Sequence, residues 1–274
     1  MAKYQDALPL YRQEKILQRI GVDIPRATLA NWMTRLGALI QPLINLIQDK
    51  LLAYDILGMD ETLLQVLKEP GRKATSNSYL WVQRGGPPDQ TVVLFHYDPS
   101  RGQVVADELL SEYQGFIQTD GYEVYEAVAN RRSDIILVGC MAHARRKFDE
   151  AVKAQGNKGK SKAGKAMMGL SFIQKLYRIE KAIKGAPPEE RYKVRHEQAN
   201  PVLDDLHTWL EKSLPEVPPG SATGKALNYL HNQWEKLIRY IDDGRLSIDN
   251  NATERSIKPF VIGRNYAHPA IMRS

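Results

Sequence analysis

The spacing of apolar residues divides the chain into segments of different period. Residues 8–20 place apolar side chains at helical spacing, and "GVDIP" then interrupts the pattern. Pro25 suits the first turn of a second helix, and residues 26–53 continue as one helix or two, with a kink expected at Pro42. Helix, turn and helix are typical of a DNA-reading unit, but a plain helical hairpin packed on the next domain fits the pattern equally well.

The middle of the chain has the composition of strands. Residues 54–67, 78–84 and 91–97 are rich in β-branched and aromatic residues, and turns containing Gly, Pro and Asn separate them. Helix and strand patterns then alternate, so the later strands are expected to be parallel. The expected helices are 102–113, 122–130 and 141–154, and the expected strands between them are 115–120 and 134–140. This order predicts an α/β fold that begins with an antiparallel meander.

The last part of the chain is helical in pattern. A Gly-, Lys- and Ser-rich linker is expected at 155–165, and helices follow at 166–184, 188–213 and 222–242 without any further strand pattern. We therefore predict four parts. These are an N-terminal helical segment (1–52), an α/β core (53–154), a helical insertion (155–245) and a return to the core (246–274).

Composition narrows the classes of protein to which the chain can belong. The chain has 274 residues, 43% hydrophobic and 26% charged, and no apolar run approaches the ~20 residues of a membrane span. The N-terminus lacks the apolar core of a signal peptide. Cys140 is the single cysteine, which excludes an intrachain disulfide and favours a reducing compartment, the cytoplasm.

The charge distribution favours a polyanionic partner. The net charge is +6, and basic residues far outnumber acidic ones between Arg145 and Lys165. Residues 255–274 carry no acid and four basic residues, two of which are Arg255 and Lys258. A solvated surface would also explain each run, but two basic stretches that flank candidate acidic sites favour nucleic acid.

Two aspartates stand where α/β active sites form. Asp60, in "ILGMDETLL", is expected at the end of the first strand, with Glu61 beside it. Asp120, in "FIQTDGY", is expected at the end of another strand and precedes Gly121. A carboxylate at a strand end points into the mouth of the sheet. Taken alone, each is matched by ordinary turn or surface chemistry.

A third acid follows the helical insertion. Glu254 lies in "DNNATERSIK", where Asn250, Glu254 and Lys258 share one helical stripe. Alone, the segment is equally well explained as a capped surface helix with a Glu254–Lys258 ion pair. Together with Asp60 and Asp120, however, it would complete the three carboxylates that hold two divalent ions about 4 Å apart in phosphoryl transfer.

"GCMAHARRKF" places Cys140 and His143 in a C-x-x-H arrangement. A structural zinc site needs a second such pair, and no second cysteine exists. We therefore expect a packed cysteine and a histidine hydrogen-bonded near the acidic cluster. The sequence contains no Gly-rich phosphate loop and no G-x-S-x-G elbow.

The motifs as a set resemble a known family. "LPLYRQEKILQRIGVDIPRATLANWM", "MDET", "EPGRKATSNSYLWVQRGGPP", "VVLFHYDPSR", "GFIQTDGYEVY", "VGCMAHARRKF" and "LSIDNNATERSIKPFVIGR" are similar, in this order, to the IS66 family of bacterial insertion-sequence transposases. The resemblance implies a DDE core with a ribonuclease-H-like mixed sheet and an all-α insertion before the last acid. It also implies that Asp60, Asp120 and Glu254 are the catalytic, metal-binding acids.

The resemblance further implies the chemistry and the partners. Two Mg²⁺ or Mn²⁺ ions would support nicking at element ends, followed by attack of the freed 3′-hydroxyl on target DNA. The partners would be element ends, target DNA, further copies of the chain and accessory proteins of the same element. Candidate DNA contacts are Arg145, Arg146, Lys147, Arg255 and Lys258, and candidate supporting residues are Cys140, His143 and Asn250.

Two departures from the family pattern leave alternatives open. Family members are longer, with a cysteine-rich segment and a helical pairing region before this part, and with "KNWLF" after "FVIGR" where this chain has "NYAHPAIMRS". A copy truncated at both ends is therefore expected, and the missing tail would normally brace the Glu254 helix. The alternatives are an inactive DNA-binding remnant, a ribonuclease-H-like structure-specific nuclease, and a chain that does not fold stably.

Overall fold

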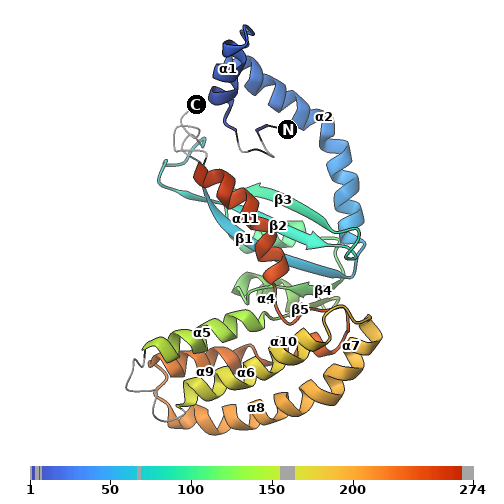
Figure 1. Ribbon diagram of the computed structural model, residues 1–274, viewed down its shortest axis with the longest axis vertical. Helices are drawn as coiled ribbons and strands as arrows, with labels where there is room; N and C mark the ends of the chain where they lie inside the picture. The colour runs from blue at the N-terminus through green and yellow to red at the C-terminus, as the bar shows by residue number, and fades with distance from the viewer. Residues whose placement is uncertain (1, 4–5, 7, 67–68, 155–163, 267–274) are drawn as a thin grey trace. The chain divides into compact units, whose positions relative to one another are not determined.

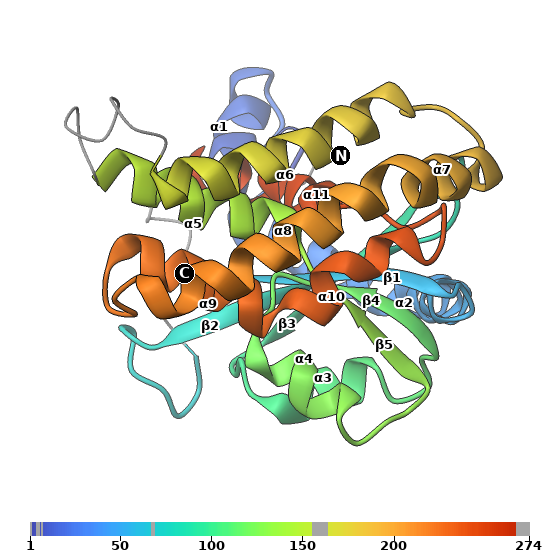
Figure 2. The ribbon, with the colours of Figure 1, turned by 90° about the horizontal axis from the view of Figure 1, so that it is seen from below.

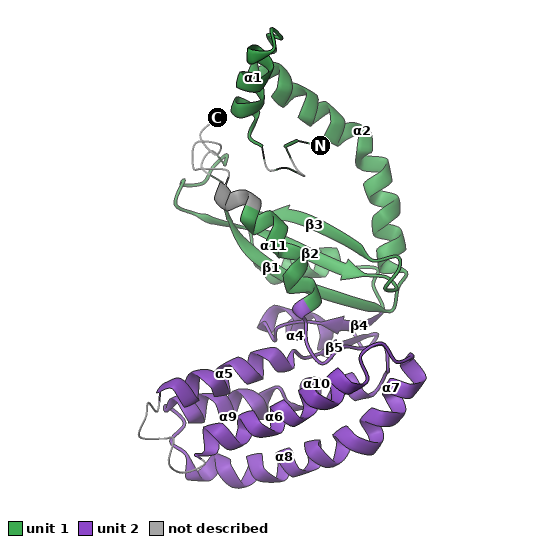
Figure 3. Ribbon diagram, viewed as in Figure 1, with its two compact units in different colours: residues 1–114, 252–274 green, residues 115–251 purple. Residues whose placement is uncertain are grey.

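The computed structural model describes residues 2–3, 6, 8–66, 69–154 and 164–266, and describes side chains as far as Ile262 (Figure 1). Most of the linker expected at 155–165, and the end of the chain after Tyr266, lie outside this part. Two compact units make up the chain, and Figure 3 colours them. Unit 1 comprises residues 1–114 and 252–274, and unit 2 comprises residues 115–251. The four-part division expected from the sequence stays a prediction.

Unit 1 begins with two helices, α1 (Leu10–Arg19) and α2 (Arg26–Leu52). Residues 26–52 form one helix, with Pro42 inside it, and Figure 1 shows that α2 changes direction along its length. A proline inside a helix removes one backbone hydrogen bond and crowds the preceding turn, which accounts for such a bend. The turn between the helices is fastened where the backbone N–H of Arg26 donates to Glu14 Oε1 at 2.8 Å.

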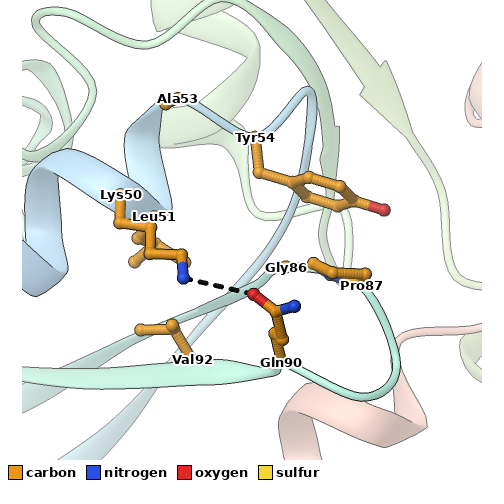
Figure 4. A pocket seen from close by; sticks show the side chains of 8 residues that line it. All are labelled: Lys50, Leu51, Ala53, Tyr54, Gly86, Pro87, Gln90 and Val92. Carbon is orange, nitrogen blue, oxygen red and sulfur yellow. Dashed lines mark hydrogen bonds between the residues drawn. The ribbon is translucent and has the colours of Figure 1, made fainter.

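The last turn of α2 is anchored to the sheet of unit 1. Leu51 is buried, and Lys50 Nζ donates to Gln90 Oε1 at 3.2 Å (Figure 4). These residues line a pocket of about 120 Å³ together with Ala53, Tyr54, Gly86, Pro87 and Val92. The C-terminal end of the helix is therefore held by the turn between two strands.

The sheet of unit 1 is an antiparallel meander of β1 (Ile56–Gln65), β2 (Asn77–Gly85) and β3 (Val92–Asp98), as the sequence predicted. Asp60 of β1 lies opposite Val82 of β2, which lies opposite Phe95 of β3. Directly opposed residues point to the same face of a sheet, so these three side chains form one row. A short helix, α3 (Gln103–Leu109), follows the meander.

The helix α11 (Asn251–Tyr266) lies across this meander (Figure 1). Phe260 of α11 packs on Phe95 of β3, with ring centroids 6.3 Å apart. Because Phe95 belongs to the row that begins at Asp60, α11 covers the face of the meander that carries Asp60. Leu57 and Met59 of β1 point to the other face and are buried.

Unit 2 contains the parallel pair β4 (Gly115–Gln118) and β5 (Ile135–Val138), as expected for strands joined by a helix. The connecting helix is α4 (Glu123–Ala129), and α5 (Met141–Ala154) follows β5. Beyond the linker, the described residues of this unit form helices and turns without strands. These are α6 (Lys165–Ala182), α7 (Pro188–Val194), η2 (Arg195–Ala199), α8 (Asn200–Ser213), η3 (Leu214–Glu216), α9 (Ala222–Asn232), α10 (Trp234–Ile238) and η4 (Arg239–Ile241).

The helices of unit 2 pack into a layer. Figure 2 shows α5, α6 and α8 side by side, and α5 also packs on α9. Gly169 of α6 allows the closest approach, because a Cβ there would lie 2.5 Å from the ring of Phe148 in α5. The other edge of that ring faces Trp209 of α8, with centroids 6.3 Å apart. Small and large residues thus interdigitate across the layer.

A buried arginine joins this layer to the segment that leads back to α11. Arg195 is fully buried and forms an ion pair with Glu180 of α6, at 2.8 Å for both Nε and Nη2. The same guanidinium donates to the backbone carbonyls of Tyr240, Asp243 and Leu246. One side chain therefore satisfies three carbonyls near the end of the helical insertion.

The expected fold class is confirmed. Antiparallel strands come first, parallel strands alternate with helices afterwards, and a helical block precedes α11, which is consistent with a ribonuclease-H-like fold. None of the helices in the described ranges is both long enough and apolar enough to cross a membrane.

Candidate active site

Asp60 lies in the middle of a strand. The sequence placed it at the end of the first strand, and this detail is wrong because β1 continues to Gln65 in register with β2. The carboxylate is partly exposed, and its Oδ1 accepts a hydrogen bond from the backbone N–H of Glu61 at 2.8 Å. The backbone that carries Asp60 is therefore fixed, because β1 pairs with β2 on both sides of this residue.

Glu61 points the other way and has its own partner. It lies opposite Trp81, on the face of the meander that α11 does not cover. Its Oε1 accepts a hydrogen bond from Arg101 Nε at 2.8 Å, and the Glu61 side chain is only 2% exposed. Of the two adjacent acids, Asp60 alone is on the face of α11.

Glu254 lies in the first turn of α11 and is partly exposed. The next residue, Arg255, is close enough to Arg84 of β2 for its charge to act on it, and burial together with that charge lowers the pKa of Arg84. Arg84 points to the same face as Val82, so the first turns of α11 lie over the row beside Asp60. Asp60 and Glu254 therefore belong to the same face of unit 1.

Arg84 is a candidate residue that the sequence did not reveal. It lies alone in a strand, outside the basic runs that charge counting detects. Only strand register and the position of α11 bring it within electrostatic range of Arg255. The two like charges repel each other, and an anion such as a DNA phosphate would relieve that repulsion.

Asp120 lies two residues after the last residue of β4, close to the strand end at which the sequence placed it, and belongs to unit 2. Its Oδ1 accepts from the backbone N–H of Tyr122 at 3.0 Å, and its backbone carbonyl accepts from the hydroxyl of Tyr229 at 3.1 Å. Gly121 has φ +91°, and a Cβ there would lie 3.3 Å from Gln233 Oε1. The chain thus turns sharply after Asp120 at a position that suits glycine.

Residues 246–250, here called the return segment, run beside the ends of β4 and β5. Gln118, two residues before Asp120, donates from Nε2 to the carbonyl of Ser247 at 2.6 Å. The backbone N–H of Met141 donates to the carbonyl of Ile248 at 3.0 Å. These bonds join positions more than 100 residues apart and hold the residues that precede α11 next to the strand ends.

Cys140 contributes to the same anchoring. It is fully buried, and its Sγ accepts a hydrogen bond from the backbone N–H of Asn250 at 3.2 Å. Burial raises the pKa of the Cys140 thiol to about 11, so the sulfur is neutral at ordinary pH. Asp249 accepts from the backbone N–H of Asn251 at 3.2 Å and from the hydroxyl of Tyr177 at 2.9 Å. Asp249 is thereby engaged at the start of α11.

The basic residues of α5 lie near these elements. Arg145 and Arg146 are exposed, and the Arg145 guanidinium lies 5.5 Å from the ring centroid of Tyr177. Lys147 Nζ lies 4.9 Å from the ring centroid of Tyr229, the residue whose hydroxyl binds the carbonyl of Asp120. In α11, Arg255 and Lys258 are exposed.

The three candidate acids are divided between the two units. Asp60 and Glu254 belong to unit 1, and Asp120 belongs to unit 2. The convergence of all three carboxylates on one point stays a prediction.

A model of the Transposase IS66 family matches residues 1–270. The chain belongs to this family. The resemblance recognised in the motifs is confirmed. The chain is similar to the uncharacterized protein y4qI of Sinorhizobium fredii, at 33% identity over 275 residues, covering 96% of this chain and 50% of the relative. It is also similar to the uncharacterized protein y4jD of the same organism, at 33% identity over 278 residues, covering 96% of this chain and 52% of the relative.

This IS66-family chain therefore spans about half the length of the curated relatives it matches. No solved structure matches it. Membership assigns a transposase-related function, and the residues that perform it are the subject of the following proposal.

Proposed function

We propose that this chain is the catalytic part of a DDE transposase that cleaves and joins DNA at insertion-sequence ends. Asp60, Asp120 and Glu254 would be the catalytic acids. The observation that carries the proposal is the packing of α11 on the face of the meander that presents Asp60, fixed by the contact between Phe260 and Phe95. This packing places a helix with an acid in its first turn over an aspartate-bearing face, the arrangement that a shared metal site requires.

The return segment supports the assignment of Glu254 as the third acid. Its hydrogen bonds to Gln118 and Cys140 hold the chain near the strand end that precedes Asp120, immediately before α11 begins. Glu254 is four residues beyond Asn250, about one helical turn. We infer that the short connection brings Glu254 toward Asp120 as well as toward Asp60.

The donor set fits divalent ions. Three carboxylates from separate elements are hard oxygen ligands of the kind that Mg²⁺ and Mn²⁺ accept, and the neutral, buried Cys140 thiol is a poor competitor for such ions. Two such ions, when bound, would activate the attacking oxygen and stabilise the leaving oxygen at phosphorus. Asp60, Asp120 and Glu254 would together hold these ions.

The cations of the chain would position the DNA. Arg84 and Arg255 share the face of Asp60 in unit 1 and would bind a phosphate near the reacting bond. Lys258 follows on the next turn of α11, and Arg145, Arg146 and Lys147 of α5 would contact the backbone farther along the duplex. The partners would be the element ends and a target duplex, with further copies of the chain and accessory proteins of the element.

The test is metal-dependent nicking by the full chain. The probe is labelled duplex DNA from either flank of the encoding locus, with Mg²⁺ or Mn²⁺, compared with unrelated duplex and branched DNA. Asp60→Asn should reduce nicking to background. Glu61→Gln is the matched control, because Glu61 points to the opposite face and its amide oxygen can still accept from Arg101. Glu61→Gln should retain nicking, with thermal melts confirming that both variants fold.

The outcomes separate the alternatives. Nicking that is insensitive to Asp60→Asn would overturn the assignment of the acids. Salt-sensitive DNA binding without nicking in either metal would identify an inactive binding remnant. Equal cleavage of flanking and unrelated branched DNA would identify a structure-specific nuclease. A broad, non-cooperative melt of the parent chain would show that it does not fold stably.

A further inference from the structure

The helix α2 has a long apolar seam that the other described residues of the chain leave exposed. Trp32, Leu36, Leu39, Leu43 and Leu46 are all exposed, with Leu39 at 78% and Leu46 at 66%. Both ends of the helix are held, because Leu29 and Leu51 are buried. Residues 34–43 between them are exposed on every side of the helix.

The spacing of these residues identifies the kind of partner. They recur at alternating steps of four and three residues, which is the 3.5-residue period of a left-handed coiled coil. That period matches a second α-helix packed along the seam, and it does not match a sheet edge or a flat surface. A solvent-exposed helix of three turns is also marginal in water unless an apolar face is covered.

We propose that α2 pairs with α2 of a second copy of this chain, in antiparallel orientation. Centred near Gln41, two antiparallel copies would pack Leu36 against the partner's Leu46 and Leu39 against the partner's Leu43. A twofold axis makes each contact occur twice, so one helix supplies both halves of the seam. The seam extends over most of the 27 residues of α2, which span about 40 Å.

Charge decides the orientation. Arg35 and Asp49 are the only charged residues that flank the seam between positions 33 and 49, and both are exposed. In the antiparallel arrangement, Arg35 lies beside the partner's Asp49, and the twofold axis creates this pair twice. In a parallel arrangement, Arg35 would instead lie beside the partner's Ile40, with no charge to pair. The antiparallel arrangement therefore has electrostatic complementarity that the parallel one lacks.

Ile40 strengthens the same conclusion. It flanks the seam next to Leu39 and is 40% exposed. Antiparallel packing brings it toward the partner's Ile40 across the axis, so the apolar surface widens at the centre. The pairing would hold two copies through unit 1, and it does not depend on the assignment of the catalytic acids.

The first test is the mass of the purified full chain by sedimentation velocity without DNA, over a range of micromolar concentrations. A dimer is expected. Leu39→Glu should weaken it at least about a hundredfold, because the change buries an uncompensated charge in the seam. Ala38→Glu is the matched control, since Ala38 is also exposed on α2 but points away from the seam. A monomeric parent chain, or a dimer insensitive to Leu39→Glu, would overturn the proposal.

The second test reads the orientation. Arg35→Glu should weaken the dimer by about three- to tenfold, and adding Asp49→Arg to it should restore the affinity. Mixed Leu39→Cys and Leu43→Cys chains should form the 39–43 disulfide in preference to 39–39 or 43–43. The native Cys140 is buried, and the parent chain, which carries this cysteine alone, measures the background of disulfide formation. Preferential 39–39 and 43–43 bonds would establish a parallel pair and overturn the orientation. Nicking activity is measured separately, so a failed dimer test and a failed catalytic assignment remain distinguishable.

Discussion

Phe260 packs on Phe95 with ring centroids 6.3 Å apart, and this contact fixes α11 on the meander. Phe95 is on β3 and Phe260 is in the second half of α11, six residues beyond Glu254 in the first turn of the helix. The contact therefore orients the acid from a distance of more than one helical turn.

Phe260→Ala should reduce metal-dependent nicking by about tenfold or more while lowering stability by only about 1–2 kcal/mol. The stability loss is small because Phe95 remains partly exposed, but a misplaced acid costs rate steeply. Ile262→Ala is the control on the same helix, since Ile262 is 53% exposed. Equal loss of nicking in both variants would show that the aromatic contact has no specific role in positioning Glu254.

Arg195→Met should destabilise the chain by about 3–5 kcal/mol. The change leaves Glu180 with only the longer ion pair to Arg191, at 3.7 Å, and removes the donors of three carbonyls in and before the return segment. Urea unfolding measures the loss. Lys153→Met is the control, because its ion pair with Asp149 is exposed to solvent and contributes little to stability. Similar losses in the two variants would contradict a structural role for the buried pair.

Gly121→Ala should lower nicking more than its stability loss explains. The residue has φ +91°, which costs an L side chain about 1–2 kcal/mol, and the new Cβ would press on Gln233 beside Asp120. Gly185→Ala is a matched control, because Gly185 has φ +92° and a Cβ there meets open space. Both variants should lose similar stability, but only Gly121→Ala should alter nicking. Unchanged nicking in Gly121→Ala would argue against Asp120 as a catalytic acid.

The stability of unit 1 should depend on His96 at mildly acidic pH. Burial lowers the pKa of His96 below its ordinary value of 6.5, and its Nε2 lies 2.9 Å from Gln83 Oε1. The unfolded chain therefore binds a proton that the folded chain resists. This contribution to stability is complete above pH 6.5 and is lost as the pH falls from 6.5 toward the folded pKa.

Urea unfolding at a series of pH values checks this expectation. His96→Gln should flatten the pH dependence below pH 6.5, because a Gln amide can bond to Gln83 without titrating. An identical slope in the parent and the variant would assign the pH dependence to other groups.

Much of the local structure followed from the sequence. The expected strand at 134–140 is β5, the expected helix at 141–154 is α5, and the meander has the expected order. These elements were predictable because their apolar residues recur at the regular spacing of a helix or a strand, and because turns with Gly, Pro or Asn separate them. The position of Asp60 within the first strand was predicted wrongly, although the expected range of 54–67 already extended beyond it, and residues 61–65 do continue the pairing with β2.

The sequence by itself determined the order of strands and helices and the identity of the candidate acids, since periodicity and motifs are local properties. The tertiary structure alone decided which face each side chain occupies. Strand register turns Asp60 toward α11 and Glu61 toward Arg101, although the two acids are adjacent in the chain. Packing across long separations also brought Arg84 within electrostatic range of Arg255 and Ser247 into hydrogen-bond contact with Gln118. Such contacts depend on the whole fold, and no local pattern encodes them.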